Sequence, residues 1–173
     1  MSGKGNSGVW PVLKPPARRR RIPGQIVEIA LGQGKKSYAR VLKEPLFAFY
    51  DKIFDASDNP NTENVVQLPI AFKINVMNSS VTSGRWHIIG RIDLTPDLEK
   101  VPSFCKQDIV TGELFIYQEV PELAPDYERP ATAEECKGLE AAAVWDAEHV
   151  EDRLRDHFAG QPNEWVEQLR PRF

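Results

Sequence analysis

Short segments with the two-residue apolar alternation of β-strands follow one another through the first two thirds of the chain. Turn signals such as Gly32-Gln33-Gly34 and Pro45 separate them, rather than the long helical stretches that connect parallel strands. This spacing predicts hairpins in an antiparallel sheet and argues against a doubly wound α/β fold. The six predicted strands cover residues 24–31, 37–42, 46–54, 67–77, 85–94 and 113–118.

Helix signals replace the strand signals towards the C-terminus. Thr132 and Glu135 have the spacing of a capping box, which predicts a short helix continuing to about Ala143. Asp146 and Gly160 are residue types that cap the start and the end of a helix, so we expect a second helix between them.

The second predicted helix carries one apolar stripe. Val150, Leu154 and Phe158 lie near one line along it, and we expect this face to dock on the sheet. Glu151 and Arg155 are expected to form an i,i+4 pair on the surface. The predicted fold is therefore α+β and mainly β, with a curled antiparallel or barrel-like sheet of about six strands and C-terminal helices packed on it.

The net charge of −3 conceals a strong asymmetry along the chain. Residues 1–43 have a charge of +9, whereas residues 44–173 have a charge of −12. Together with composition, this predicts a flexible basic arm over residues 1–22, a β-rich domain over residues 23–120, and an acidic helical extension over residues 121–173 packed on the same core.

A run of arginines in the arm is the only hint of a nucleic-acid partner. No Phe or Tyr that could stack on bases is interleaved with Arg18, Arg19, Arg20 and Arg21. A solubilising tail, or an arm that folds back on the acidic part of the chain, explains the run equally well. We therefore do not expect nucleic acid as the partner.

The sequence offers no pattern of catalytic or metal-binding residues. His149 and His157 are eight positions apart, about 12 Å along a helix, which is too far for both to bind one zinc ion. Gly32-Gln33-Gly34 lacks the further residues of a phosphate-binding loop. We expect no enzymatic activity, no cofactor and no metal.

Cys105 and Cys136 are the two cysteines, and no Cys-x-x-Cys motif is present. We expect two reduced thiols, one or both of them buried, with a disulfide or a reactive thiol as the alternatives. The chain contains no apolar run long enough to span a membrane, and Val9–Leu13 is too short for the core of a signal peptide. The predicted location is the cytoplasm.

One face of the second predicted helix is acidic. Glu148, Asp152 and Asp156 recur every four residues along it. Such a stripe is either a solvated surface or a contact for a basic partner, and both interpretations remain open.

Two stretches of the chain resemble a known family. Pro23–Asp51 reads PGQIVEIALGQGKKSYARVLKEPLFAFYD and Trp86–Leu94 reads WHIIGRIDL. The Gly-started strand, the Tyr-Ala-Arg-Val-Leu strand and the Phe-Tyr-Asp strand resemble the immunity protein 26 family of bacterial polymorphic toxin systems. The resemblance covers roughly residues 20–118.

The resemblance implies an intracellular protein that binds and neutralises a cognate toxin, often a nuclease, and it implies no catalytic residues. Tyr38, Arg40, Phe49 and Asp51 match positions of the family motif. Together with Glu148, Asp152 and Asp156 of the acidic stripe, they are the candidate partner-binding residues.

Two other functions remain open from the sequence. One is a small β-barrel that binds nucleic acid, or a ribonuclease-like enzyme, using Arg40, Arg85 and the arginine arm. The other is a scaffolding domain that has no toxin partner.

Overall fold

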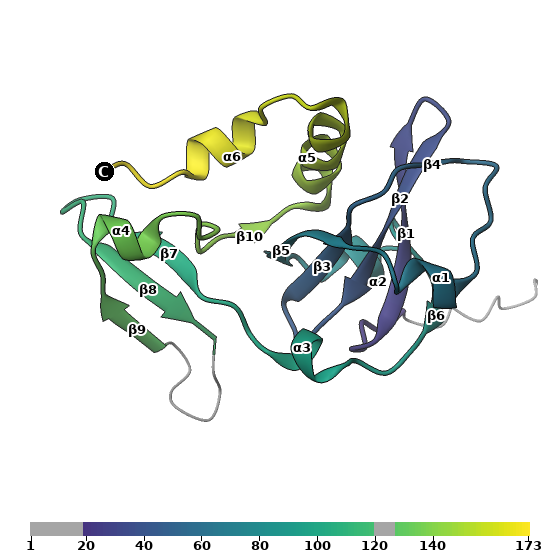
Figure 1. Cartoon of the computed structure of the whole chain (residues 1–173), viewed down its shortest axis with the longest axis horizontal. Coiled ribbons are helices and arrows are strands. Elements are labelled where there is room, and N and C mark those ends of the chain that lie inside the picture. Colours follow the sequence, from purple (N-terminus) through teal and green to yellow (C-terminus); the bar gives the residue numbers. More distant parts are fainter. Residues whose placement is uncertain (1–18, 120–126) are drawn as a thin grey trace, which may run out of the picture.

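The strands form two sheets in the computed structural model, which describes residues 19–119 and 127–173 (Figure 1). The predictions for residues 1–18, including Arg18, and for residues 120–126 lie outside the described part. The larger sheet contains β1 (Gln25–Gly32), β2 (Lys35–Val41), β3 (Leu46–Tyr50), β4 (Phe54–Asp55), β5 (Ile70–Val76), β6 (His87–Arg91) and β10 (Val144–Trp145). The smaller sheet contains β7 (Phe104–Gln107), β8 (Leu114–Gln118) and β9 (Tyr127–Pro130).

The strand order of the larger sheet is β10-β5-β3-β2-β1-β6, with β4 paired to β2, and the order of the smaller sheet is β7-β8-β9. All pairs are antiparallel except β10 with β5. The predicted α+β, mainly β class is confirmed, but the strands divide into two sheets and do not close into a barrel. The helices are α1 (Thr62–Val65), α2 (Ser79–Thr82), α3 (Pro96–Glu99), α4 (Ala133–Cys136), α5 (Ala147–Ala159) and α6 (Glu164–Leu169).

The β1–β2 hairpin forms where the glycine-containing turn predicted it. Gly32, Gln33 and Gly34 all have positive φ angles, which glycine adopts without steric cost. The side chains of β2 then alternate as expected: Ala39 and Val41 face one apolar cluster, and Tyr38 faces another. The register of β1 with β6 shifts between Ile26, which pairs with Gly90, and Val27, so a bulge interrupts this pairing.

Both faces of the larger sheet are apolar. On one face, β1, β2, β3 and β5 contribute buried residues to a single cluster, which α5 and β10 complete with Val150, Leu154 and Trp145. The opposite face carries two smaller clusters, one around Tyr38 and Tyr50 and the other around Leu42, Ala48 and Phe104. The sheet therefore needs a cover on each side.

Helix α5 begins after Asp146 and ends at Gly160, as predicted, and Gly160 adopts the left-handed conformation. Val150 and Leu154 are fully buried against the sheet, and Phe158 is half-buried on the same cluster. The predicted docking face is therefore confirmed.

The predicted surface pair of Glu151 with Arg155 is wrong. Glu151 is buried and ion-paired with Arg85, while Arg155 bonds to Asp152 and to the carbonyl of Leu31. Glu151 directly follows Val150, so it lies at the edge of the buried face rather than on the outer side of the helix.

Several boundaries differ from the predictions. Neither β7 nor β9 is among the six strands that the sequence predicts. The capping box of Thr132 with Glu135 is present, but α4 ends at Cys136 instead of near Ala143. The backbone is already extended at Lys137, and Gly138 follows it with a positive φ angle of 80°.

The expectation of two reduced thiols is also wrong, because Cys105 of β7 and Cys136 of α4 form a disulfide with their Cα atoms 5.2 Å apart. Both residues are buried beside Ile116 of β8. The pairing depends on how α4 packs on the smaller sheet, and residues 31 positions apart carry no local signal of it.

The last arginine of the predicted basic arm is fixed on the larger sheet. The Arg21 guanidinium lies 4.1 Å from the centroid of the Phe47 ring and donates to the carbonyls of Leu46 and Val76 at 2.9 Å. Burial lowers the pKa of Arg21 to about 10, so the side chain stays charged at neutral pH.

The packing of α5 predicts that the C-terminal extension stabilises the β-rich part. Leu154→Ala should lower the free energy of unfolding by about 2–5 kcal/mol, because the leucine is fully buried and its removal leaves a cavity. Leu169→Ala is the control, since Leu169 is 39% exposed and its truncation should cost less than about 1 kcal/mol. Urea unfolding followed by tryptophan fluorescence measures both. Equal effects of the two substitutions would contradict the role of α5 in the core.

Candidate partner-binding surface

Three of the family-motif candidates lie inside the fold. Tyr38 and Arg40 are 1% and 2% exposed, and Phe49 is completely buried. The Tyr38 hydroxyl donates to the Glu28 carboxylate at 3.1 Å. Phe49 stacks on the ring of Phe72 with the centroids 5.0 Å apart. In this position they support the sheet from within, and direct contact with a partner stays a prediction for them.

Arg40 connects β2 to the chain that follows β6. Its guanidinium donates to the backbone carbonyls of Ile92 and Asp93. The side chain lies close to that of Tyr50, and burial raises the pKa of the Tyr50 hydroxyl. Arg40 is therefore a buried residue that links β2 to the segment after β6.

Asp51 is exposed at the end of β3, where it meets α5. Its carboxylate lies 2.7 Å from Nε2 of His157. Asp51 is therefore a surface residue at the contact between the end of β3 and α5.

The acidic stripe of α5 is joined by an aromatic side chain of α6. Trp165 donates its indole N–H to Asp152 at 3.2 Å and stacks on His149 with the ring centroids 3.7 Å apart. Asp156 accepts a hydrogen bond of 2.7 Å from Asn163, the N-cap of α6. We call the outer face formed by Glu148, Asp152, Asp156 and Trp165 the acidic surface.

The acidic surface keeps its negative charge despite these internal contacts. Residues 146–169 contain seven carboxylates and two arginines. Partial burial opposes ionisation of Asp152, but hydrogen bonds from Arg155 and Trp165 outweigh it and lower the pKa of this carboxyl. Asp152 therefore carries a full charge at neutral pH.

An ion pair between the half-exposed Arg85 and the buried Glu151 fixes α5 in place beside the acidic surface. Glu151 accepts hydrogen bonds from Arg85 Nε at 2.7 Å, from Arg85 Nη2 at 2.8 Å and from Trp86 Nε1 at 2.9 Å. The hydrogen bond to Glu151 raises the pKa of Arg85. Arg85 also reaches Glu148 at 3.1 Å, so it holds two carboxylates one turn apart. The predicted surface pair with Arg155 did not anticipate this contact, although the position of Glu151 next to the buried Val150 was an available signal.

A second ion pair connects α5 to the segment between α4 and β10. Arg153 binds Glu140 in a bidentate arrangement with distances of 3.0 and 2.5 Å. Its guanidinium lies 3.9 Å from the centroid of Phe72 and 5.1 Å from that of Trp145. This contact ties the smaller sheet to the core of the larger one, and no sequence pattern pointed to it.

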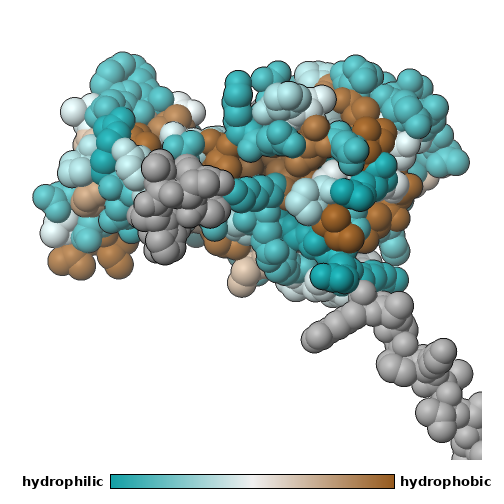
Figure 2. Space-filling view, turned by 90° about the horizontal axis from the view of Figure 1, so that it is seen from below, coloured by the Kyte–Doolittle hydropathy of each residue, from teal (hydrophilic) through white to brown (hydrophobic). Residues whose placement is uncertain are grey.

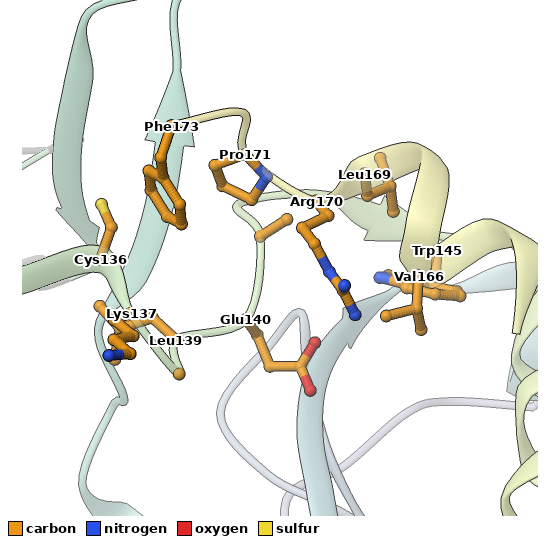
Figure 3. Close-up of a pocket in the computed structure, with 12 residues that line it drawn as sticks. Cys136, Lys137, Leu139, Glu140, Trp145, Val166, Leu169, Arg170, Pro171 and Phe173 are labelled. Carbon is orange, nitrogen blue, oxygen red and sulfur yellow. The ribbon is translucent and has the colours of Figure 1, made fainter. Parts of the chain in front are cut away.

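A cleft of about 330 Å³ lies between α6 with the C-terminal tail and the segment after α4 (Figure 3). In Figure 3, Phe173 and Pro171 line one side, Leu139 and Glu140 lie across from them, and the Arg170 side chain extends towards Glu140. The tail is held against β7 by two hydrogen bonds of 2.8 and 2.9 Å between Gln107 and the backbone of Arg172.

The side of the molecule that carries α3 has a mixed surface. Hydrophilic residues separate the hydrophobic ones there into several patches (Figure 2). Over residues 19–119 and 127–173, no group of three or more His, Cys, Asp or Glu side chains is arranged to hold a metal ion. Within the same ranges, none of the helices has the length and apolar composition needed to cross a bilayer.

Comparison with known protein families gives one match. The family described as immunity protein 26 matches residues 22–113, which is more than half of the chain. The chain belongs to the immunity protein 26 family. No curated protein and no solved structure matches it.

The match confirms the resemblance seen in the sequence, and it covers only part of this immunity protein 26 chain. The matched residues contain β1 to β7, with Tyr38, Arg40, Phe49 and Asp51 among them. Helices α5 and α6, and with them the acidic surface, lie beyond the match. The matched residues therefore supply the larger sheet apart from β10, and the C-terminal extension supplies the cover of its larger apolar cluster.

The buried ion pair leads to a prediction about this immunity protein. Glu151→Gln should lower the free energy of unfolding by about 2–3 kcal/mol, because it leaves Arg85 without its buried counter-charge while Arg85 remains partly hydrated. Glu148→Gln removes the other carboxylate on Arg85, and it should cost less than about 1 kcal/mol because Glu148 is 72% exposed. Thermal and urea unfolding of both variants measure the difference. A larger effect at Glu148 would show that the buried pair is not what holds α5.

Proposed function

We propose that this protein binds a cognate toxin in the cytoplasm and neutralises it by protein–protein contact. Membership of the immunity protein 26 family is the observation that carries the proposal. The fold fits a binding role, because most of its charged and aromatic motif residues are used to build a rigid support. A rigid support reduces the entropy lost when two proteins associate.

The acidic surface is the part of the molecule that we assign to the first contact with the toxin. Its three carboxylates are exposed or half-buried on α5, and Trp165 of the adjacent α6 lies among them. Tryptophan is enriched among residues that dominate binding energy, and clustered like charges steer an oppositely charged partner. A basic toxin suits this surface, and nucleases are commonly basic because they bind phosphates.

The nucleic-acid-binding alternative finds little support in the arginines that it needs. Arg40 is buried between strands, and Arg85 is bound to two carboxylates of α5. Arg21 packs on Phe47, and Arg18 lies outside the described residues. The sheet is also open, in contrast to the small closed barrel expected for that function.

Growth protection tests the proposed function directly. Cells that express the toxin encoded next to this protein should grow only when the full chain is co-expressed, because the complex blocks the toxin. The purified chain should form a complex with that toxin in size-exclusion chromatography. Continued killing by the toxin, with no complex formed, would reject the proposal.

The acidic surface gives a kinetic prediction. Glu148→Gln with Asp156→Asn should lower the association rate constant for the toxin by about threefold to tenfold at low salt, because two steering charges are lost. The dissociation rate constant should change less. The difference in association rate constant between this double variant and the wild type should shrink as the salt concentration rises. Stopped-flow fluorescence at several salt concentrations measures both rates.

Asp97→Asn with Glu99→Gln on α3 is the matched control, since it removes the same charge from the side of the molecule opposite α5 and α6 (Figure 1). This variant should associate as fast as the wild type. If both double variants slow association equally, net charge is responsible rather than the acidic surface.

A further inference from the structure

The turn between β7 and β8 exposes two branched aliphatic side chains. Ile109 is 98% exposed and Val110 is 88% exposed, the highest values among the large apolar residues that the structure describes. Phe173 comes next at 70%. Polar residues are the usual choice at the tip of a hairpin, and two adjacent apolar side chains there forgo all stabilisation from burial.

The turn that carries these side chains is rigid. The Asp108 carboxylate accepts hydrogen bonds of 2.8 Å from the backbone N–H groups of both Val110 and Thr111. Backbone bonds of 2.9 Å run from Gly112 to Asp108 and from Asp108 to Glu113. The bonds from Thr111 and Val110 lower the pKa of Asp108, so the arrangement persists at neutral pH. The apolar tip is thus held in one conformation before any partner arrives.

The base of the hairpin is also anchored. The disulfide joins Cys105 of β7 to α4, and Gln107 is bonded to the C-terminal tail at Arg172. A rigid element that is prepared for binding loses less entropy on association than a flexible loop does.

The tip lies at the end of the proposed binding side. Figure 1 shows α5, α6, the C-terminal end and the β7–β8 turn following one another along one edge of the molecule. The bonds between Gln107 and Arg172 confirm that the tail and the hairpin are in contact. The tip therefore lies beyond the C-terminal tail, at the far end of the edge that α5 and α6 begin.

The charges around the tip indicate the chemistry of the partner. Asp108 and Glu113 stand on either side of the two aliphatic residues, and the nearby Lys106 is ion-paired with Glu128 at 2.6 Å. Two copies of this tip would bring like charges together, which disfavours self-association through it. A recess with an apolar floor would accommodate the aliphatic side chains, and basic side chains at its rim would complement the flanking carboxylates.

We infer that the β7–β8 tip inserts Ile109 and Val110 into an apolar recess with a basic rim on the cognate toxin. This inference rests on the proposed function. It adds an anchor that determines how long the complex lasts, alongside the acidic surface that determines how fast it forms.

The test uses the full chain and the toxin encoded next to it. Ile109→Ser with Val110→Ser should raise the dissociation constant at least about tenfold, mainly through faster dissociation, because an apolar anchor is lost. Its melting temperature should equal that of the wild type, since both side chains are exposed. Biolayer interferometry and thermal unfolding provide these two measurements.

Met77→Ser with Val144→Ser is the matched control. These residues are neighbours at the end of β5 and β10 and are 48% and 53% exposed. The control should bind the toxin as tightly as the wild type. Equal loss of binding in both double variants would overturn the inference.

Three other outcomes separate the hypotheses. If the wild type does not bind the toxin, the proposed function and the inference fail together. If the wild type and the tip variant bind equally, only the inference fails. If sedimentation shows that the wild type is a dimer and the tip variant a monomer, the tip serves self-association and the inference is also overturned.

Discussion

The larger sheet is apolar on both faces, and the rest of the structure follows from the need to cover both. Short segments and loops cover one face, where Tyr38 and Tyr50 lie. The other face carries the larger cluster, and α5 closes it with Val150 and Leu154. The family match ends at residue 113, so the matched part supplies this face without its main cover. The C-terminal extension is therefore an integral part of the core, even though the family pattern does not include it.

Charged residues stabilise this arrangement at its margins. Arg40 clamps the strands from within, Glu151 locks α5 through Arg85, and Arg153 joins α5 to the smaller sheet. A buried charge that loses its partner is costly, so each of these residues favours a single packing arrangement. These charged residues hold the elements of the fold together. The surfaces that we propose for binding, the outer face of α5 and α6 and the tip of the β7–β8 hairpin, lie outside these contacts.

The sequence predicted the parts of the fold that depend on local pattern. Alternating residues predicted the β1–β2 hairpin, and the cap at Gly160 predicted the end of α5. The short strand β9 was not predicted, because its sequence contains charges and a proline. The disulfide of Cys105 was not predicted, because it depends on a tertiary contact. The candidate binding residues, too, were predictable only where a local pattern determines their position. Helical period placed the acidic stripe on an outer face, but no pattern distinguishes a motif arginine that binds from one that is buried.

The position of α5 has a consequence for how the protein is made. Synthesis produces the strands of the larger sheet well before the helix that covers their apolar face, because only β10 among them follows β6 in the chain. Until α5 leaves the ribosome, the nascent sheet exposes a surface suited to aggregation or to chaperone binding. Translation that stops before α5 therefore yields products whose larger apolar face has lost its main cover.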